Sequence, residues 1–249
     1  MRFKDKVVVV TGSSRGMGRE IAIAFGREGA KVVVNYRSNL EEARGVENQV
    51  KIAGGEAVSI QADVSHPEEV KKLFEETVKT FGRVDILVNN AGIERPKPFL
   101  QVTFEDMEEV FQTNFLGLFV ACQEAVKIMQ KTGGGKIINT ASVRGLDYMG
   151  RVGNMDYSAS KAAVINFTRT LAKAVAPAIC VNAIAPGPTE TDMAKTWTAE
   201  ERAQKERKSR LGRLMQPAEI AQAVLYLASQ DGITGEIMVI DGGYSLGSD

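Results

Sequence analysis

The sequence predicts one doubly wound α/β domain, in which a seven-stranded parallel sheet carries helices on both faces. Short runs of apolar, β-branched residues alternate with helix-length stretches whose apolar residues are three and four positions apart. Most of these runs are continuously apolar, as expected of strands buried on both faces. No Pro/Ser-rich linker, internal repeat or low-complexity tract divides the 249 residues, so we expect a single domain over residues 1–249.

Seven segments have the length and the β-branched composition of strands. They are Val7–Val10, Lys31–Val34, Ala57–Ile60, Ile86–Val88, Lys136–Asn139, Val181–Ile184 and Ile237–Ile240. The helix predicted after the first strand, Arg19–Phe25, follows a glycine-rich turn. His66 lies where a later helix begins, and we expect it to cap that helix or to lie at the surface.

Three further helices are predicted in the second half of the chain. Thr103 with Asp106 is expected to cap a helix that runs to Lys131, before a turn at glycines 133–135. The apolar face of that helix reads Met107, Phe111, Leu118, Cys122, Ala125 and Met129. A second helix begins at Tyr157, and a third begins near Pro217.

Composition and charge exclude several classes of function. Lys+Arg and Asp+Glu are both 31, so the chain lacks the basic excess expected of a non-specific nucleic-acid or anionic-membrane binder. With one histidine and two cysteines, a multi-histidine metal site is impossible, and we expect neither a metal nor a disulfide framework. No apolar run approaches a membrane span, and four valines near the N-terminus are too few for a secretory signal. We expect a soluble, cytoplasmic protein.

The turn after the first strand predicts a dinucleotide site. Gly12 permits the tight turn, Gly16 lets a phosphate approach the backbone, and Gly18 lets helix and strand pack closely. A pyrophosphate would meet the free N–H groups and the positive end of the helix that follows.

The end of the second strand favours NADP(H) over NAD(H). An NAD site would place an acid here for the ribose 2′-hydroxyl, but none occurs before Glu41. Arg37 can instead pair with a 2′-phosphate, and Arg15 in the first turn can reach it too. The alternative is that both arginines are simply solvated on loops.

Tyr157 and Lys161 are four residues apart and therefore share a helix face. An ammonium beside a phenol favours the phenolate, so we expect Lys161 to lower the pKa of Tyr157 from its ordinary value of about 10. A positively charged nicotinamide would act in the same direction. The tyrosine then becomes a usable general acid or base in a chain that can hardly use histidine.

Two more polar residues support this interpretation. Ser142 follows the fifth strand, at the carboxyl edge where ligands bind in such sheets, and its hydroxyl can hold a substrate oxygen. Asn114 falls on the apolar stripe of its helix, and a buried amide needs partners. It is either a structural anchor or part of a polar network that reaches the site.

Residues 186–210 interrupt the alternation of strands and helices, and their end is rich in charge. A solvated helix is one interpretation. The other is a mobile lid over a ligand, because insertions after strand ends line the binding crevice of such sheets.

Together these motifs resemble the short-chain dehydrogenase/reductase family over essentially the whole chain. The matching motifs are Thr11-Gly12-x-x-x-Gly16-x-Gly18, Asp63-Val64, Asn89-Asn90-Ala91-Gly92, the catalytic set Asn114, Ser142, Tyr157 and Lys161, and Pro186-Gly187. The resemblance implies a Rossmann-type fold and reversible hydride transfer between a nicotinamide and a ketone or secondary alcohol. It implies that Tyr157 exchanges the proton, Ser142 holds the oxygen, Lys161 lowers the tyrosine pKa and holds the ribose, and Asn114 supports a water.

The resemblance also implies the cofactor-binding residues. They are Gly12, Ser14, Arg15, Gly16, Met17, Gly18, Tyr36, Arg37, Ser38, Asp63, Val64, Asn90, Ala91, Gly92, Tyr157, Lys161, Pro186, Gly187, Thr189 and Thr191. Family members are commonly homotetramers, with helices matching Thr103–Lys131 and Asp156–Ala176 in one interface and the strand near Ile237–Ile240 in another. Phe115 and Phe119 beside the core stripe suit a second contact face.

Within the family the chain is most similar to 3-oxoacyl-carrier-protein reductases and glucose 1-dehydrogenases. Those reductases carry docking arginines before strands five and six, where this chain has Gln130–Lys136 and Ala174–Cys180 without arginine, which puts acyl-carrier protein in doubt as a partner. We expect a small-molecule carbonyl or 3-oxoacyl reductase. A sugar or polyol dehydrogenase is the alternative, since Glu94 and the polar 143–156 loop can meet hydroxyls. A non-catalytic NADP-binding sensor is a remote third.

Overall fold

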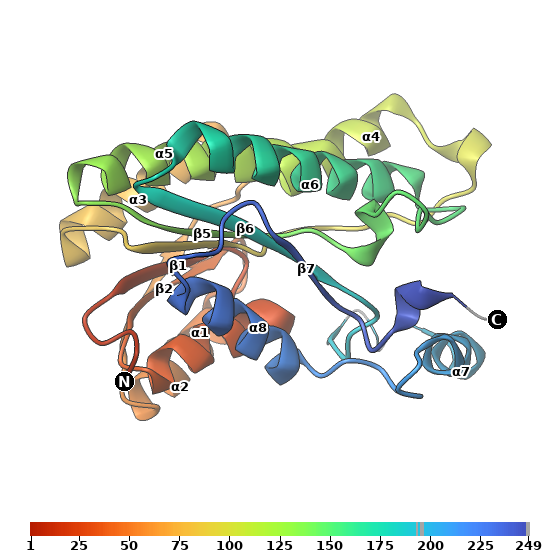
Figure 1. Cartoon of the computed structure of the whole chain (residues 1–249), viewed down its shortest axis with the longest axis horizontal. Coiled ribbons are helices and arrows are strands. Elements are labelled where there is room, and N and C mark those ends of the chain that lie inside the picture. Colours follow the sequence, from red (N-terminus) through yellow and green to blue (C-terminus); the bar gives the residue numbers. More distant parts are fainter. Residues whose placement is uncertain (193, 195–196, 248–249) are drawn as a thin grey trace.

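The computed structural model describes residues 1–192, 194 and 197–247. Seven parallel strands form one sheet in the order β3-β2-β1-β4-β5-β6-β7 (Figure 1). Their bounds are β1 Val7–Val10, β2 Lys31–Tyr36, β3 Glu56–Gln61, β4 Ile86–Asn89, β5 Gly135–Thr140, β6 Ile179–Pro186 and β7 Ile237–Ile240. The predicted doubly wound parallel sheet is confirmed. The strands after β1 are added first on one side of it (β2, β3) and then on the other (β4 to β7), and this change in strand order opens a crevice at the carboxyl ends of the strands.

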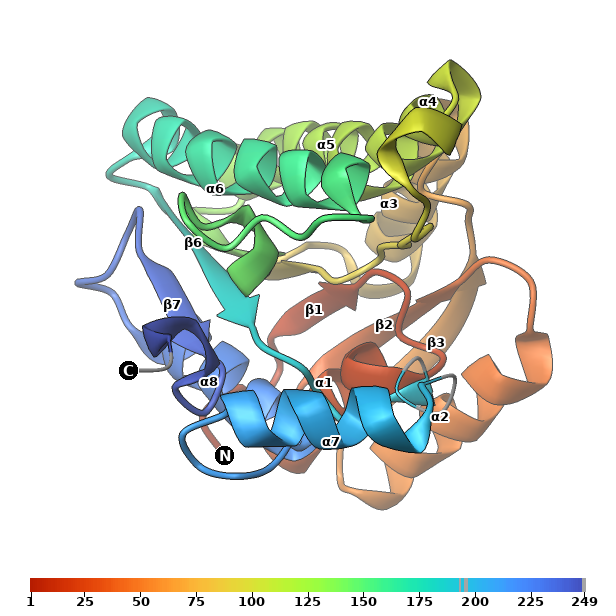
Figure 2. The same ribbon diagram turned by 90° about the vertical axis from the view of Figure 1, so that its right-hand side faces the viewer.

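Helices cover both faces of the sheet (Figures 1 and 2). Their bounds are α1 Gly16–Arg27, α2 Leu40–Ile52, α3 Pro67–Phe81, α4 Phe104–Phe111, α5 Gly117–Lys131, α6 Met155–Val175, α7 Ala199–Lys208 and α8 Pro217–Ser229. Apolar side chains of α1, α2 and α8 form one core cluster with the sheet, and those of α3, α5 and α6 form another. Within the described residues, no helix is long and apolar enough to cross a membrane.

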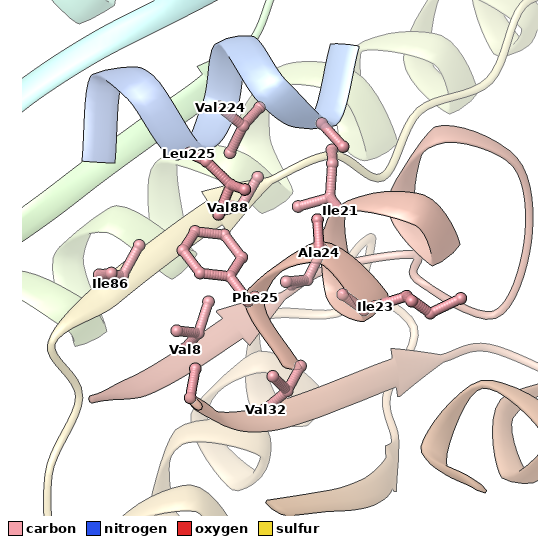
Figure 3. Close-up of a cluster of buried hydrophobic side chains, with 14 of the residues drawn as sticks. Val8, Ile21, Ile23, Ala24, Phe25, Val32, Ile86, Val88, Val224 and Leu225 are labelled. Atoms are coloured by element: carbon pink, nitrogen blue, oxygen red, sulfur yellow. The ribbon is translucent and has the colours of Figure 1, made fainter. Parts of the chain in front are cut away.

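The core between α1 and the sheet is built around Phe25, in the last turn of α1. Its ring is fully buried and lies among side chains from the sheet and from α8, as Figure 3 shows for Val8, Ile86 and Leu225. Burying a ring of this size stabilises the fold by about 1.5–3 kcal/mol. Because this packing fixes α1 against β1, it also fixes the turn that joins them.

The two edge strands differ from the prediction of burial on both faces. Strand β1 is buried throughout, whereas β3 is mostly half-buried and Val239 of β7 is 41% exposed. An edge strand has only one neighbour, and the helix layers do not extend fully over it. Helix packing therefore shields the central strands, whose carboxyl ends carry the candidate site.

The helix predicted from Thr103 to Lys131 is interrupted. Thr103 caps α4 as expected, in a capping box with Asp106. A π-helical turn, Gln112–Leu116, then separates α4 from α5. Met107 is 37% exposed and Phe111 is only half-buried, so the apolar stripe predicted for this helix is wrong at its start. Single π turns often occur at functional sites, and this one holds Asn114.

Two smaller predictions have mixed outcomes. His66 does lie at the start of α3 and at the surface, but its side chain makes no capping hydrogen bond. The charged stretch near residue 200 does form a helix, α7, which begins with a capping box between Thr198 and Glu201. Residues 193, 195 and 196 of the 186–210 segment lie outside the described residues.

Candidate active site

The glycine turn between β1 and α1 has the backbone that phosphate binding requires. Gly12 and Gly16 adopt φ values of +59° and +57°, in the left-handed region that favours glycine. Arg15 precedes α1 in an extended conformation, and its side chain does not cap the helix. The first N–H groups of α1 are thus left for an anion, as in dinucleotide sites.

Asn90 fixes this turn from the neighbouring strand. Its Nδ2 donates to the carbonyl oxygens of Thr11 and Gly12, each at 3.0 Å. A Cβ on Gly18 would lie 2.5 Å from that same Nδ2 and 2.6 Å from the Gly12 oxygen. Only glycine fits at position 18, because the Asn90 amide and the Gly12 oxygen already occupy the place that a Cβ would take.

Two residues that support the turn are missing from the sequence-based site. The Oγ1 of Thr11 accepts from the backbone N–H groups of Asn90 and Ala91, at 3.0 and 3.1 Å. Asn35 is buried; its Oδ1 accepts from the Gly12 N–H, and its Nδ2 donates to the Ala62 oxygen. The available signal was a polar residue inside or at the end of an otherwise apolar strand.

Of the two arginines expected to select NADP(H), Arg37 follows β2 and Arg15 directly precedes α1. Arg37 is exposed, and its Nε lies 4.0 Å from Oδ2 of Asp63, a distance at which the ion pair is weak. The other oxygen of that carboxylate accepts from the N–H and hydroxyl of Ser65. Arg15 and Ser38 are exposed, while Tyr36 and Val64 are buried. The two arginines are therefore accessible to an added phosphate.

Ten of the 22 predicted site residues line one pocket at the carboxyl edge of the sheet. They are Met17, Asn90, Gly92, Ser142, Tyr157, Lys161, Pro186, Gly187, Thr189 and Thr191. Figure 2 looks onto this edge, with α6 above it and α7 below. The remaining members, such as Arg37 and Asp63, lie toward β2 and β3, while Asn114 lies behind the pocket wall.

Lys161 and Tyr157 lie one turn apart on α6, as their spacing predicted. The Nζ of Lys161 is buried and donates to the Thr140 backbone oxygen at 2.7 Å. It also lies 5.7 Å from the centroid of the Tyr157 ring. Ser142 follows β5 directly, is 6% exposed, and its Oγ accepts from the Arg144 N–H at 3.1 Å.

The electrostatics of this pair differ from the expectation that Lys161 depresses the tyrosine pKa. Burial raises the pKa of Tyr157 to about 12, although a hydrogen bond with Ser142 opposes the shift. Burial also lowers the pKa of Lys161 to about 8. In the protein alone, desolvation is the main cause of both shifts, because it disfavours the charged form of each group.

Asn114 serves first as a structural anchor. Its Oδ1 accepts from the Ile93 N–H at 2.8 Å, and its Nδ2 donates to the Ile93 oxygen and to Oγ of Ser160, at 2.9 and 3.1 Å. Gly92 lies between it and the lysine, since a Cβ there would be 3.3 Å from Asn114 Oδ1 and 3.5 Å from Lys161 Nζ. The amide thus ties the segment after β4 to α6, and its role toward a water stays a prediction.

Further side chains line the outer part of the pocket. They are Glu94, Arg144, Arg151, Trp197 and Lys205. The sequence had singled out Glu94 and the 143–156 loop individually, while Trp197 and Lys205 belong to the 186–210 segment, for which a lid was one of two interpretations. Glu94 is held by Asn154, whose Nδ2 donates to Oε2 at 2.9 Å. Across the described residues, no cluster of three or more His, Cys, Asp or Glu side chains is arranged to hold a metal.

Comparison with known proteins gives consistent results over nearly the whole chain. The family model described as enoyl-(acyl carrier protein) reductase matches residues 12–245. A 3-oxoacyl-(acyl-carrier-protein) reductase of Synechocystis sp. is 41% identical over 242 residues, which is 96% of each chain. The reductase FabG of Aquifex aeolicus is 39% identical over 247 residues, 98% of each chain. The crystal structure of a short-chain type dehydrogenase/reductase from Mycobacterium marinum matches with a TM-score of 0.93 and 34% identity, covering 98% of this chain and 96% of that one.

Proposed function

Because this chain belongs to the short-chain dehydrogenase/reductase family and is an NAD(P)-dependent oxidoreductase, we propose that it reduces small ketones with NADPH. The observation that carries the proposal is the meeting of Ser142, Tyr157 and Lys161 in one pocket with the glycine turn's neighbours Met17 and Asn90. The bound nicotinamide supplies the hydride when the carbonyl is reduced, or accepts it in the reverse reaction.

The raised pKa of Tyr157 suits the reducing direction. A phenol with a pKa of about 12 is protonated at neutral pH and can donate its proton to a carbonyl oxygen. Ser142, which hydrogen-bonds Tyr157, can hold the same oxygen. Lys161, with a pKa of about 8, is mostly protonated at neutral pH and can return a proton toward the phenol.

The residues at the phosphate end fit NADP(H). The extended backbone at Arg15 and the left-handed glycines at 12 and 16 leave the first turn of α1 open to a pyrophosphate. Arg37 directly after β2 and Arg15 directly before α1 are exposed cations, in the region where a 2′-phosphate would lie. These observations support NADP(H) over NAD(H).

We further propose that the substrate is a small molecule and not an acyl-carrier-protein thioester. The curated relatives are named for carrier-protein substrates. In this chain Lys136, one of two lysines near the place of the docking arginines, is already engaged. Its Nζ lies 2.7 Å from Oδ1 of Asp231, 2.7 Å from the Gln230 oxygen and 3.3 Å from Sγ of Cys180. It therefore offers little to an acidic protein surface.

The proposal extends to assembly and to the 186–210 segment. Phe119 is 37% exposed and packs with Phe115 against Phe167, at ring distances of 5.3 and 5.8 Å, which supports a homotetramer contact on α5 and α6. Sedimentation at several concentrations tests the homotetramer, and a monomer at every concentration contradicts it.

Trp197 and Lys205 of the 186–210 segment line the pocket, which supports a lid that covers the substrate.

A substrate panel with NADPH and NADH tests the activity. It contains acetoacetyl thioesters, simple ketones, diketones, glucose and other polyols, with the alcohols assayed against NADP and NAD. We expect faster turnover of ketones with NADPH than of any polyol with NADP. Oxidation of glucose or another polyol as the best reaction favours the sugar dehydrogenase instead, and Glu94 in the pocket is the feature that supports it. Tight cofactor binding with no turnover favours a sensor.

A further inference from the structure

Three cations line the pocket beyond the catalytic residues. Arg144, Arg151 and Lys205 border both the catalytic pocket and a second hollow beside it, where Lys208 joins them. They come from two parts of the chain, the loop after β5 and helix α7. The catalytic pocket therefore continues into a strongly basic recess.

Lys205 is the most informative of these residues. It is only 9% exposed, and its Nζ lies 4.6 Å from the centroid of the Trp197 ring. Within residues 1–192, 194 and 197–247, it forms no ion pair with a carboxylate. A buried ammonium is costly unless an anion or hydrogen-bond acceptors compensate it.

Among the groups around Lys205, two arginines add positive charge, and the nearest carboxylates form no ion pair with it. Arg144 donates to the Met149 oxygen and the Tyr244 hydroxyl, both uncharged acceptors. Neither Arg144 nor Arg151 pairs with a carboxylate anywhere in the described chain. Burial is the main cause that lowers the pKa of Lys205, and Arg151 and Arg144 act in the same direction; Glu201 and Glu94 oppose them, but the pKa still falls. Glu94 is the one carboxylate among the described residues that line the two hollows.

We propose that the substrate carries an anionic group, a carboxylate, phosphate or sulfonate, which binds Arg144, Arg151 and Lys205 while its carbonyl oxygen lies at Ser142 and Tyr157. The proposal rests on the ketone reductase function proposed above and names the class of ketone. An anion in the recess compensates the buried charge of Lys205, and two guanidinium groups suit a planar or tetrahedral oxyanion.

The recess does not serve the 2′-phosphate of the cofactor. Arg144 follows Ser142 by two residues, at the end of β5. Arg37 follows β2, and the sheet order places β1 and β4 between β2 and β5. Three strand spacings separate those ends by about 14 Å. The two basic regions therefore bind different anions, one on the cofactor and one on the substrate.

Trp197 gives a direct readout of this site without turnover. It is the single tryptophan of the chain and lies against Lys205, so an anion in the recess should change its fluorescence. Succinate, inorganic phosphate and ethanesulfonate serve as probes, with succinamide as the uncharged comparison. We expect a saturable change with at least one anion and none with succinamide.

Variants on α7 make the titration specific. Lys205→Gln removes the buried charge, and Arg207→Gln removes an exposed charge from the same helix outside both hollows. We expect the anion affinity to fall about 10-fold or more in the first variant and to be unchanged in the second. Equal affinities in all three proteins, or no response to any anion in the wild type, would overturn the proposal.

Kinetics with acetoacetate and its neutral methyl ester complete the test. The wild type should prefer acetoacetate, and Lys205→Gln or Arg151→Gln should lower the ratio of kcat/KM for acid over ester by about 10- to 100-fold. Reduction of both ketones with a ratio that no variant changes overturns the anion site but leaves the reductase function intact. Saturable anion binding at Trp197 without reduction of any ketone overturns the function but supports the site. A preference for a carrier-protein thioester over acetoacetate counts against the small anionic substrate.

Discussion

Lys161 donates its 2.7 Å hydrogen bond to the backbone oxygen of Thr140, while its Nζ lies 5.7 Å from the centroid of the Tyr157 ring. The two side chains share a face of α6, yet burial dominates the pKa of each. The pKa of Tyr157 is about 12 and that of Lys161 is about 8, so both side chains are mostly protonated at neutral pH. The pair is thus set to donate a proton at neutral pH.

The low pKa of Lys161 makes stability depend on pH. Its ordinary pKa of 10.5 falls to about 8 in the folded protein, so between these values the unfolded chain holds more protons. Stability from this residue therefore rises with pH over that window. Relative to Lys161→Met, the wild type should gain up to about 3 kcal/mol of unfolding free energy between pH 7.5 and 10.

Denaturant unfolding of both proteins across this pH range checks the prediction. Groups distant from position 161 are the same in both proteins, so their contributions cancel in the difference. A difference between the two proteins that does not change with pH contradicts the assigned pKa of Lys161.

Gly18 should not tolerate a side chain. In Gly18→Ala the added Cβ meets Asn90 Nδ2 at 2.5 Å and the Gly12 oxygen at 2.6 Å, so the turn must shift. We expect a loss of about 1–3 kcal/mol of stability, together with weaker binding of NADP.

A matched glycine provides the control for that variant. Gly45 lies in α2, and a Cβ there would meet nothing within 4 Å. Gly45→Ala should raise stability by about 0.5–1 kcal/mol and leave NADP affinity unchanged. Thermal unfolding and a cofactor titration measure both effects. If the two variants change stability and NADP affinity equally, the close contact of Gly18 with Asn90 and Gly12 does not constrain the turn.

Arg37 should select between the two nicotinamide cofactors. Its guanidinium is exposed and has only a 4.0 Å contact with Asp63, so it is available to a 2′-phosphate. Arg37→Gln should weaken NADP binding about tenfold or more and leave NAD binding nearly unchanged. Arg44→Gln, an exposed arginine of α2, should change neither affinity. If Arg37→Gln weakens both cofactors equally, the assignment of the 2′-phosphate site is wrong.

Features set by local pattern were predictable from the sequence. Continuous valine runs indicated the central strands, and the spacing of Gly12, Gly16 and Gly18 indicated the turn. The four-residue spacing of Tyr157 and Lys161 indicated a shared helix face. Each of these signals lies within a few residues of sequence and follows from backbone geometry alone.

Features set by contacts between distant segments were not predictable in this way. Asn35 reaches the glycine turn across 23 residues. Lys205 reaches the catalytic pocket from a helix for which the sequence left a solvated surface and a lid both open, and which residue of it enters the pocket was not predictable. The tyrosine pKa was expected to fall because spacing reveals the nearby lysine, but spacing does not reveal burial. The π turn at Asn114 was not predictable either, because the side chain of Asn114 bonds Ile93 and Ser160, which are distant in the sequence.

The central claim is that Tyr157 donates the proton that completes carbonyl reduction. Tyr157→Phe removes the hydroxyl but keeps the ring, so the cofactor should still bind with affinity close to that of the wild type. We expect kcat for the best ketone with NADPH to fall at least 10²- to 10⁴-fold, the usual contribution of a general acid. Turnover equal to that of the wild type, in a variant that binds NADPH normally, would contradict the account.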